Sequence, residues 1–219
     1  MRFEDWEPIY LNILDDFGFS REHDEEAARL LSCLLRDRRP DKILEEAFDL
    51  VHGQFVIVCG NAPSLAEEVK SRLEEDSVLI AADGATEVLL EEARLPSIIV
   101  TDLDGPFPAI KELNQKGSIV VVHAHGDNLD ALRNCVPQLV RVIGSTQSRP
   151  LHNVYNFGGF TDGDRCVFLA RHLGAAAIEL IGFDFDDPTV TPRKKKKLAW
   201  SRRLIELAMS EALQPARGI

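Results

Sequence analysis

The chain has 219 residues, 45% of them hydrophobic, which is enough for one sizeable core with a small appended subdomain. Its formal net charge of -11 argues against a general affinity for nucleic acid or for an acidic membrane, because neutralising phosphate groups requires clustered cations. No stretch approaches the ~20 apolar residues of a membrane span, and the N-terminus lacks a basic region followed by an apolar one. We therefore expect a soluble protein of the cytoplasm.

The first part of the chain, residues 1–52, is predicted to form a small helical subdomain. Ser20 is suited to cap a helix, and a break is expected at 38–41 before the apolar period resumes. Exposed apolar faces on these helices would allow two chains to pair, so the sequence leaves a homodimer open. Between Ser20 and this break, apolar side chains recur at the spacing of one helix face: Ala27, Leu30, Leu31, Leu34 and Leu35.

In residues 53–219 short apolar segments alternate with amphipathic helical patterns. This alternation predicts an α/β fold with a Rossmann-like, mostly parallel sheet flanked by helices. The expected strands are Phe55–Cys59, Val78–Ala82, Ile98–Thr101, Ser118–His123, Leu139–Ile143 and Ala177–Ile181.

Polar and glycine-rich segments follow these strands. In open α/β sheets ligands bind at the carboxyl edge of the strands, so the clustering of special residues there predicts a site. The segments are Gly60–Ser64, Ala82–Gly84, Asp102–Gly105, His123–Asn128, Gly144–Gln147 and Gly182–Asp184.

Asp102 and Asp104 are the most informative pair, because they follow the apolar run Ile98–Val100 directly. Gly105 lets the chain turn, so both acids can converge on one cation. Two carboxylates crowded at the end of a buried strand repel each other unless a cation or donor compensates them. We therefore predict a hard metal ion at this position.

The loop with Gly60, Asn61 and Ser64 joins a strand to a helix. Its amides are suited to hold a phosphate oxygen, with Ser64 as a helix cap or as a ligand, although an ordinary tight turn has the same pattern. Asp83, followed by Gly84, is expected either to cap the next helix or to help hold metal and nucleotide.

The segment from His123 to Asn128 contributes a further set of polar side chains. Asp127 is predicted to supply a third oxygen ligand, or else to cap the helix that follows. His125 and Asn128 are placed to meet phosphate or the reacting hydroxyl group. Two histidines without a cysteine or a second histidine pair do not make a structural zinc site.

Residues 156–165 are too rich in glycine to be expected in the core, and a flexible surface loop is one interpretation. Aromatic side chains beside acids also suit a flat heterocycle, such as a pterin. One carboxylate, Asp162 or Asp184, can accept two hydrogen bonds from the adjacent ring N–H and amino group of such a ring. The substrate-binding residues expected are Asn156, Phe157, Asp162, Asp164 and Asp184.

A basic run, Arg193–Lys197, stands out in so acidic a chain. Four consecutive lysines on a helix point in several directions, so only some can reach one site. Such a run is most often solvated. The alternative is that one or two lysines neutralise a triphosphate or the departing nucleotide.

These motifs resemble the archaeal-type 6-hydroxymethyl-7,8-dihydropterin pyrophosphokinase family, which is related in fold to thiamin pyrophosphokinases. The resemblance covers roughly Phe55 to Leu198. Four strings carry it: Ala82–Thr86, Val100–Gly105, Val122–Asn128 and Asn156–Arg165.

The resemblance implies a magnesium-dependent enzyme that moves the β,γ-pyrophosphoryl group of ATP onto the pterin hydroxymethyl group and releases AMP. It implies that residues 53–219 are the catalytic domain and that Asp102, Asp104 and Asp127 form the magnesium or phosphate site. Asp83 and the Gly60–Ser64 loop would lie nearby. The product would enter folate or methanopterin biosynthesis.

Other functions remain open at this point. A thiamin pyrophosphokinase would perform the same reaction on another alcohol. A sugar-nucleotide glycosyltransferase shares the Gly60–Ser64 type of loop and would release no AMP from ATP. A non-catalytic nucleotide-binding protein would hold metal and ATP without transfer.

Overall fold

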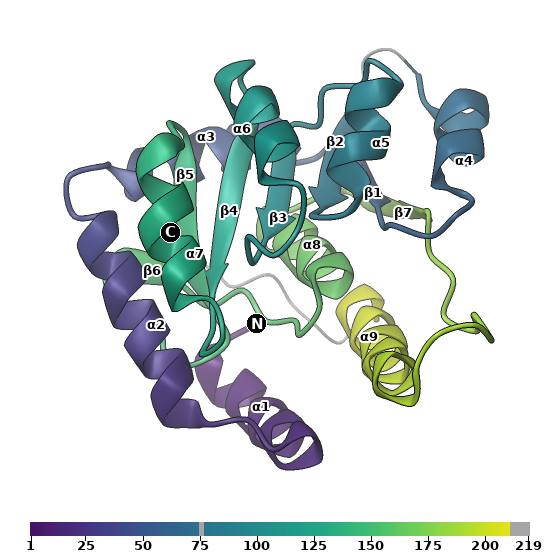
Figure 1. The fold of residues 1–219 in the computed structure, drawn as a ribbon. Helices are drawn as coiled ribbons and strands as arrows, with labels where there is room; N and C mark the ends of the chain where they lie inside the picture. Colours follow the sequence, from purple (N-terminus) through teal and green to yellow (C-terminus); the bar gives the residue numbers. More distant parts are fainter. Residues whose placement is uncertain (75–76, 211–219) are drawn as a thin grey trace.

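The structure is a computed structural model that describes residues 1–74 and 77–210. The described residues form one seven-stranded parallel sheet with the strand order β6-β5-β4-β3-β2-β1-β7 (Figure 1). The predicted α/β fold with a parallel sheet is thereby confirmed. Residues 211–219 of the predicted catalytic domain lie outside the described residues.

The strands match most of the predicted ranges. They are β1 (Phe55–Cys59), β2 (Val78–Ala82), β3 (Ile98–Thr101), β4 (Ile119–Ala124), β5 (Val142–Thr146), β6 (Val154–Tyr155) and β7 (Ala177–Ile181). The near-continuous apolar sequences of β1 to β4 follow from burial on both faces of the sheet.

Helices cover both faces of the sheet, so the fold has three layers. The chain moves from β1 to β5 in one direction with right-handed crossovers, which places α4 (Leu65–Arg72), α5 (Ala85–Glu91), α6 (Phe107–Gln115) and α7 (Leu129–Cys135) on one face. The return to β7 reverses the direction and places α8 (Asp162–His172) on the other face. α9 (Pro192–Met209) packs beside α8.

The bounds predicted for the strand at Leu139–Ile143 are wrong, since β5 begins and ends three residues later, at Val142 and Thr146. A 3-10 turn at Val136–Gln138 leads into an irregular segment in which Val140 is 68% exposed. Pairing with β4 starts only at Val142, opposite Val120. The strand ends in the polar residues Ser145 and Thr146, which an apolar pattern does not include.

The expectation that 156–165 lies outside the core is also wrong. Phe157 and Phe160 are buried in the main core cluster beneath the sheet. The glycines make this close packing feasible: Gly159 has a φ of +94°, and a Cβ there would lie 2.8 Å from Cα of Arg165.

The first three helices are α1 (Phe3–Phe17), α2 (Arg21–Leu34) and α3 (Pro40–Val51), and of these α2 and α3 pack directly on strands of the sheet. α1 and α3 share the core cluster of α8, whereas α2 covers the opposite face beside α7. Ser20 caps α2 as predicted, accepting a hydrogen bond from the amide of His23 at 3.3 Å. The division into residues 1–52 and 53–219 and the homodimer stay predictions.

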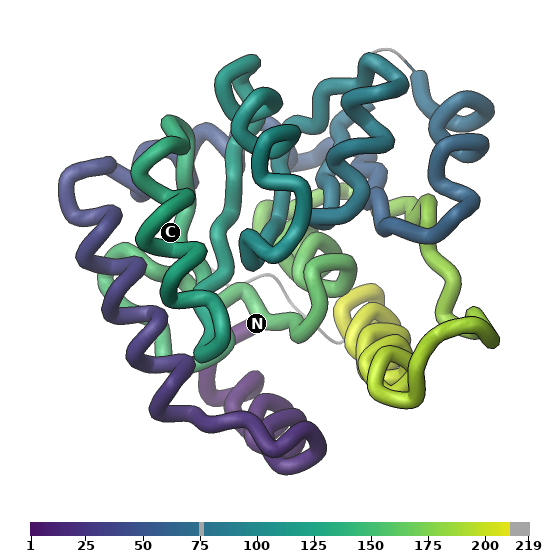
Figure 2. The backbone as a smooth tube through the Cα atoms, viewed as in Figure 1, coloured from purple at the N-terminus to yellow at the C-terminus, as the bar shows by residue number. Residues whose placement is uncertain are grey.

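Figure 2 shows that α1 and α9 both lie toward the edge of the sheet at which the strands end. α1 and α9 are joined by hydrogen bonds from the side chains of Lys196 and Trp200 to Asp16. Among the described helices, none combines the length and the apolar character that crossing a lipid bilayer demands.

Replacing Ile99 by Ala in the fully buried β3 should lower the free energy of unfolding by about 2–5 kcal/mol, because it leaves a cavity between the sheet and its helices. Urea denaturation measures this loss. Val140→Ala, at an exposed position, should change stability by less than ~0.5 kcal/mol. Equal effects of the two substitutions would contradict the assignment of β3 to the core.

Candidate active site

A cavity of about 610 Å³ opens at the carboxyl edge of the sheet. Its walls include the segments that follow β1, β2, β3, β4 and β7, together with the α1–α2 connection, the start of α8 and one side of α9. β1 and β7 leave the sheet side by side, where the chain reverses its direction across the sheet. Ligand sites of open α/β sheets lie at this kind of switch point.

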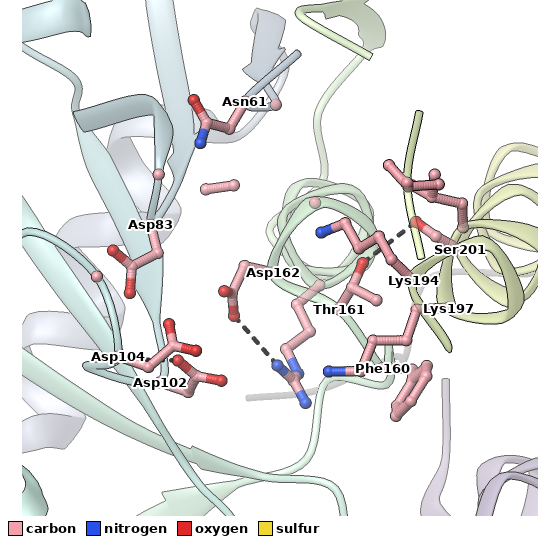
Figure 3. A pocket seen from close by; sticks show the side chains of 18 of the residues that line it. Asn61, Asp83, Asp102, Asp104, Phe160, Thr161, Asp162, Lys194, Lys197 and Ser201 are labelled. Carbon is pink, nitrogen blue, oxygen red and sulfur yellow. Dashed lines mark hydrogen bonds and ion pairs between the residues drawn. The ribbon is translucent and has the colours of Figure 1, made fainter. Parts of the chain in front are cut away.

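Three carboxylates meet in this cavity, as Figure 3 shows. Asp83 follows β2, Asp102 follows β3, and Asp162 begins α8. One oxygen from each lies within 4.8 Å of the others. We call these three residues the acidic triad.

Asp83 is the most buried member of the acidic triad, with 3% of its surface exposed. Its Oδ2 accepts a hydrogen bond of 2.5 Å from the hydroxyl of Thr101, whereas its Oδ1 has no hydrogen-bond partner among the described residues. Burial raises the pKa of Asp83 to about 6, and the negative charges of Asp102 and Asp104 raise it further against the lowering effect of Thr101.

Asp102 is held in its charged form by His125. Burial acts to raise the pKa of Asp102, but hydrogen bonding from His125 and Asp104, together with the positive charge of Arg165, outweighs this effect and the pKa is lowered. The ring Nε2 of His125 lies 3.2 Å from Oδ2 of Asp102, and its Nδ1 accepts from the amide of Asp127 at 3.4 Å. Because Nδ1 accepts, Nε2 is the ring nitrogen that donates to Asp102.

Asp162 is paired with Arg165 one turn further along α8, at 3.1 Å between Oδ1 and NH1. Burial, followed by the charge of Asp102, raises the pKa of Asp162 well above its usual value, although Arg165 acts in the opposite direction. A single guanidinium therefore does not neutralise this group of acids.

The acidic triad suits a hard divalent cation. Acidic side chains outnumber basic ones on the cavity wall, and Oδ1 of Asp83 is buried and unpartnered among the described residues. Carboxylate oxygens are the ligands that Mg²⁺ and related cations take in proteins. The donor set and its uncompensated charge fit a magnesium ion held by Asp83, Asp102 and Asp162.

A buried network links the N-terminal helices to the acidic triad. Asp24 of α2 is 3% exposed and accepts hydrogen bonds from Tyr10 at 2.7 Å, the amide of Gly126 at 2.9 Å and the side-chain amide of Gln147 at 2.8 Å. The side-chain oxygen of Gln147 lies 3.5 Å from NH2 of Arg165. Through Asp24, helix α2 thus holds Gly126 and Gln147 in position at the cavity wall.

Most of the predicted site residues do line the cavity. They are Gly60, Asn61, Asp83, Gly84, Asp102, Asp104, His125, Asp127, Asp162 and Asp184. The close acidic triad nevertheless differs from the predicted metal set, since Asp83 and Asp162 accompany Asp102. Asp104 lies beside Asp102 and Asp127 is exposed on the rim, so their roles as ligands stay predictions.

The structure does not bring five other predicted residues to the cavity wall, because their polar groups or rings have partners elsewhere. Ser64 donates to Glu68, and Asn128 bridges the carbonyls of Asp102 and His123. The carboxylate of Asp164 forms a capping box with Thr161 and is fully buried.

The remaining two belong to the connection that precedes α8. Asn156 donates to the carbonyls of Gln147 and Ser148, and Phe157 lies in the core. The substrate-binding roles predicted for Asn156, Phe157 and Asp164 are therefore not supported by their positions. The hydrogen bonds and packing of these three residues instead give them structural roles.

Sequence analysis did not assign Arg165, Gln147 or Asp24 to the site. Arg165 three residues after Asp162 is a spacing that signals an ion pair on a helix. Asp24 lies within an ordinary charged helical pattern, and nothing local distinguishes it from its exposed neighbours. Only the docking of α2 on the sheet reveals its role.

Fold and site together define an α/β protein with a ligand cavity at the switch point of a parallel sheet. The chain matches the family model described as 6-hydroxymethylpterin diphosphokinase MptE-like over residues 35–189. The chain belongs to this family and is a diphosphotransferase.

Three archaeal relatives carry the name 6-hydroxymethyl-7,8-dihydropterin pyrophosphokinase. The protein of Methanothermobacter thermautotrophicus is 46% identical, and that of Pyrococcus furiosus is 42% identical, with 94% of each chain covered in both cases. The protein of Methanocaldococcus jannaschii is 42% identical over 84% of this chain and 80% of its own.

Gly105→Ala should weaken metal binding at least ~10-fold with little effect on stability. A Cβ at Gly105 would lie 2.0 Å from Oδ1 of Asp83, so the Asp83 carboxylate must leave the position in which it meets Asp102 and Asp162. Calorimetric titration with Mg²⁺ or Mn²⁺ and thermal unfolding measure the two effects.

Gly53→Ala is the control for that substitution. A Cβ has free space there, but φ is +72°, so about 1 kcal/mol of stability should be lost without any change in metal affinity. Unchanged metal affinity in Gly105→Ala would contradict the assignment of Asp83 to the metal site.

Asp24→Ala should lower the free energy of unfolding by about 2–3 kcal/mol, because Tyr10, Gly126 and Gln147 lose a buried acceptor. Chemical denaturation measures this change. Glu26→Ala, at an exposed position on the same helix, should stay within ~0.5 kcal/mol of the parent protein. A similar loss in both variants would rule out a special role for Asp24.

Proposed function

We propose that the protein transfers the pyrophosphoryl group of ATP to the hydroxymethyl group of 6-hydroxymethyl-7,8-dihydropterin and releases AMP. The product would enter the biosynthesis of a reduced pterin, folate or methanopterin. The observation that carries the proposal is the acidic triad, which shares one cavity with basic side chains of α8 and α9 in a chain of this family.

In this proposal Asp83, Asp102 and Asp162 hold Mg²⁺, with Asp104 next to them. The ion, when bound, neutralises the phosphate oxygens and orients the polyphosphate. His125 keeps Asp102 ionised and correctly turned, and Thr101 fixes Asp83. Positioning and charge neutralisation by these residues account for most of the expected catalysis.

The transfer is balanced without a covalent enzyme intermediate. The hydroxyl oxygen of the pterin forms a bond to the β-phosphorus of ATP. The bond between that phosphorus and the oxygen bridging to the α-phosphorus breaks, and its electron pair leaves with AMP. The hydroxyl proton passes to a neighbouring carboxylate, to His125 or to solvent.

Aromatic side chains suit the pterin ring. Phe183 and Phe185 line the cavity with ring centroids 5.6 Å apart, and Asp184 lies between them in the sequence. Asp162 is paired with Arg165 and belongs to the acidic triad. We therefore assign Asp184 as the carboxylate that accepts hydrogen bonds from the adjacent ring N–H and amino group of the pterin.

The purified protein should form AMP from ATP with 6-hydroxymethyl-7,8-dihydropterin, only in the presence of Mg²⁺. Chromatography of the nucleotides measures AMP, and parallel reactions contain thiamin or a sugar nucleotide as the alternative substrate. AMP formation with thiamin alone would identify the other acceptor, and transfer from the sugar nucleotide without AMP would overturn the reaction class.

Asp102→Asn and Asp83→Asn should each lower this activity at least ~100-fold, because each removes a charged ligand of the metal. Asp130→Asn is the matched control, since Asp130 is an exposed surface residue paired with Arg133. Near-parental turnover in Asp102→Asn would show that the metal site lies elsewhere.

A further inference from the structure

The geometry of α9 places its lysines on two different faces of the helix. Each residue advances ~100° around the axis, so Lys194 and Lys197 lie ~60° apart on one face. Both line the cavity, and the adjacent Arg193 lines it too. Lys195 and Lys196 do not line the cavity.

The neighbouring lysine, Lys196, anchors the helix. Its ammonium group donates to the backbone oxygen of Asp16 at 2.6 Å and pairs with the Asp16 carboxylate at 3.0 Å. Trp200, one turn later, donates to the same carboxylate at 2.7 Å. These contacts to the end of α1 fix the rotation of α9 and keep its other face turned to the cavity.

The ammonium groups of Lys194 and Lys197 extend toward the side of the cavity that holds the acidic triad (Figure 3). Lys197 passes over the ring of Phe160 with its Nζ 5.9 Å from the centroid. Within residues 1–74 and 77–210, no carboxylate lies at ion-pair distance from either ammonium group, although acids are abundant in the cavity. Their positive charge is available to a ligand.

Placing cations and a metal site on facing walls creates a space for an anion between them. A polyphosphate chain carries several negative charges, and the acids of this cavity would repel it unless metal and ammonium groups act together. Lysine provides a compact charge with three donors that can follow phosphate oxygens as they move.

We propose that Lys194 and Lys197, assisted by Arg193, form the binding site for the polyphosphate chain of a nucleoside triphosphate, facing the acidic triad. The inference rests on the proposed function for its choice of ligand, but it needs no particular acceptor alcohol. Lys195 takes no part, and Lys196 acts only by holding the helix.

Binding of two probes tests the proposal without turnover: α,β-methylene-ATP and inorganic pyrophosphate, each with Mg²⁺ and measured by isothermal titration calorimetry. In Lys194→Gln/Lys197→Gln the affinity for both probes should fall at least ~10-fold, because charge-assisted hydrogen bonds to phosphate are lost. The affinity for AMP should change less than about twofold.

Lys195→Gln is the control, as it removes one lysine charge from the same helix at a position outside the cavity, where the double variant removes two from the cavity wall. Its affinities should remain within about twofold of the parent protein. Parental binding in the double variant, an equal loss in Lys195→Gln, or no binding of either probe by the parent protein would each overturn the proposal. Failure to turn over the pterin, with the binding pattern intact, would overturn only the proposed acceptor.

Discussion

Repulsion among carboxylates at one edge of the sheet is the constraint on which the site depends. Asp83, Asp102 and Asp162 are gathered within a few ångströms in a partly dry cavity, where like charges interact strongly. Thr101, His125 and Arg165 hold them in place without cancelling their charge. The remaining imbalance is the basis on which we propose a cation at this edge and, through it, a phosphate group.

The cavity is completed by side chains from parts of the chain outside this edge of the sheet. The segments that follow the β-strands contribute acids, glycine turns and the aromatic rings of Phe183 and Phe185 to the cavity. Other parts of the chain add Phe19, in the connection between α1 and α2, and Lys194 and Lys197 on α9. α8 contributes to both parts, because Asp162 completes the acidic triad and Arg165 lies beside it.

The sheet and the location of the site could be predicted from the sequence, because strand periodicity and polar strand ends are local signals. Asp102 was identified from the apolar run before it. Asp83 is also recognisable as a residue that either caps a helix or helps hold metal and nucleotide. The meeting of Asp162 with Asp102 is not predictable, since Asp162 is 60 positions away in the chain and reaches Asp102 only through the crossover to α8. Asp104 and Asp127 follow strands and belong to the motifs that carry the family resemblance, and these local signals favour them as ligands.

Other predictions were wrong for the same physical reason. Glycines in 156–165 indicated a loose loop, whereas they allow Phe157 and Phe160 to pack in the core. β5 ends in Ser145 and Thr146, whose hydroxyl groups are buried within a polar network that no local pattern reveals. Burial of polar groups is decided by tertiary contacts, and only the folded chain shows them.

Asp16 joins helices from opposite ends of the polypeptide, since its partners Lys196 and Trp200 lie 180 and 184 positions away. Contacts of such large sequence separation form late, because a long loop must close first. On the ribosome the acidic strand ends emerge long before α9 exists to cover them. The cavity wall that carries Lys194 and Lys197 can therefore be completed only after α9 has been synthesised.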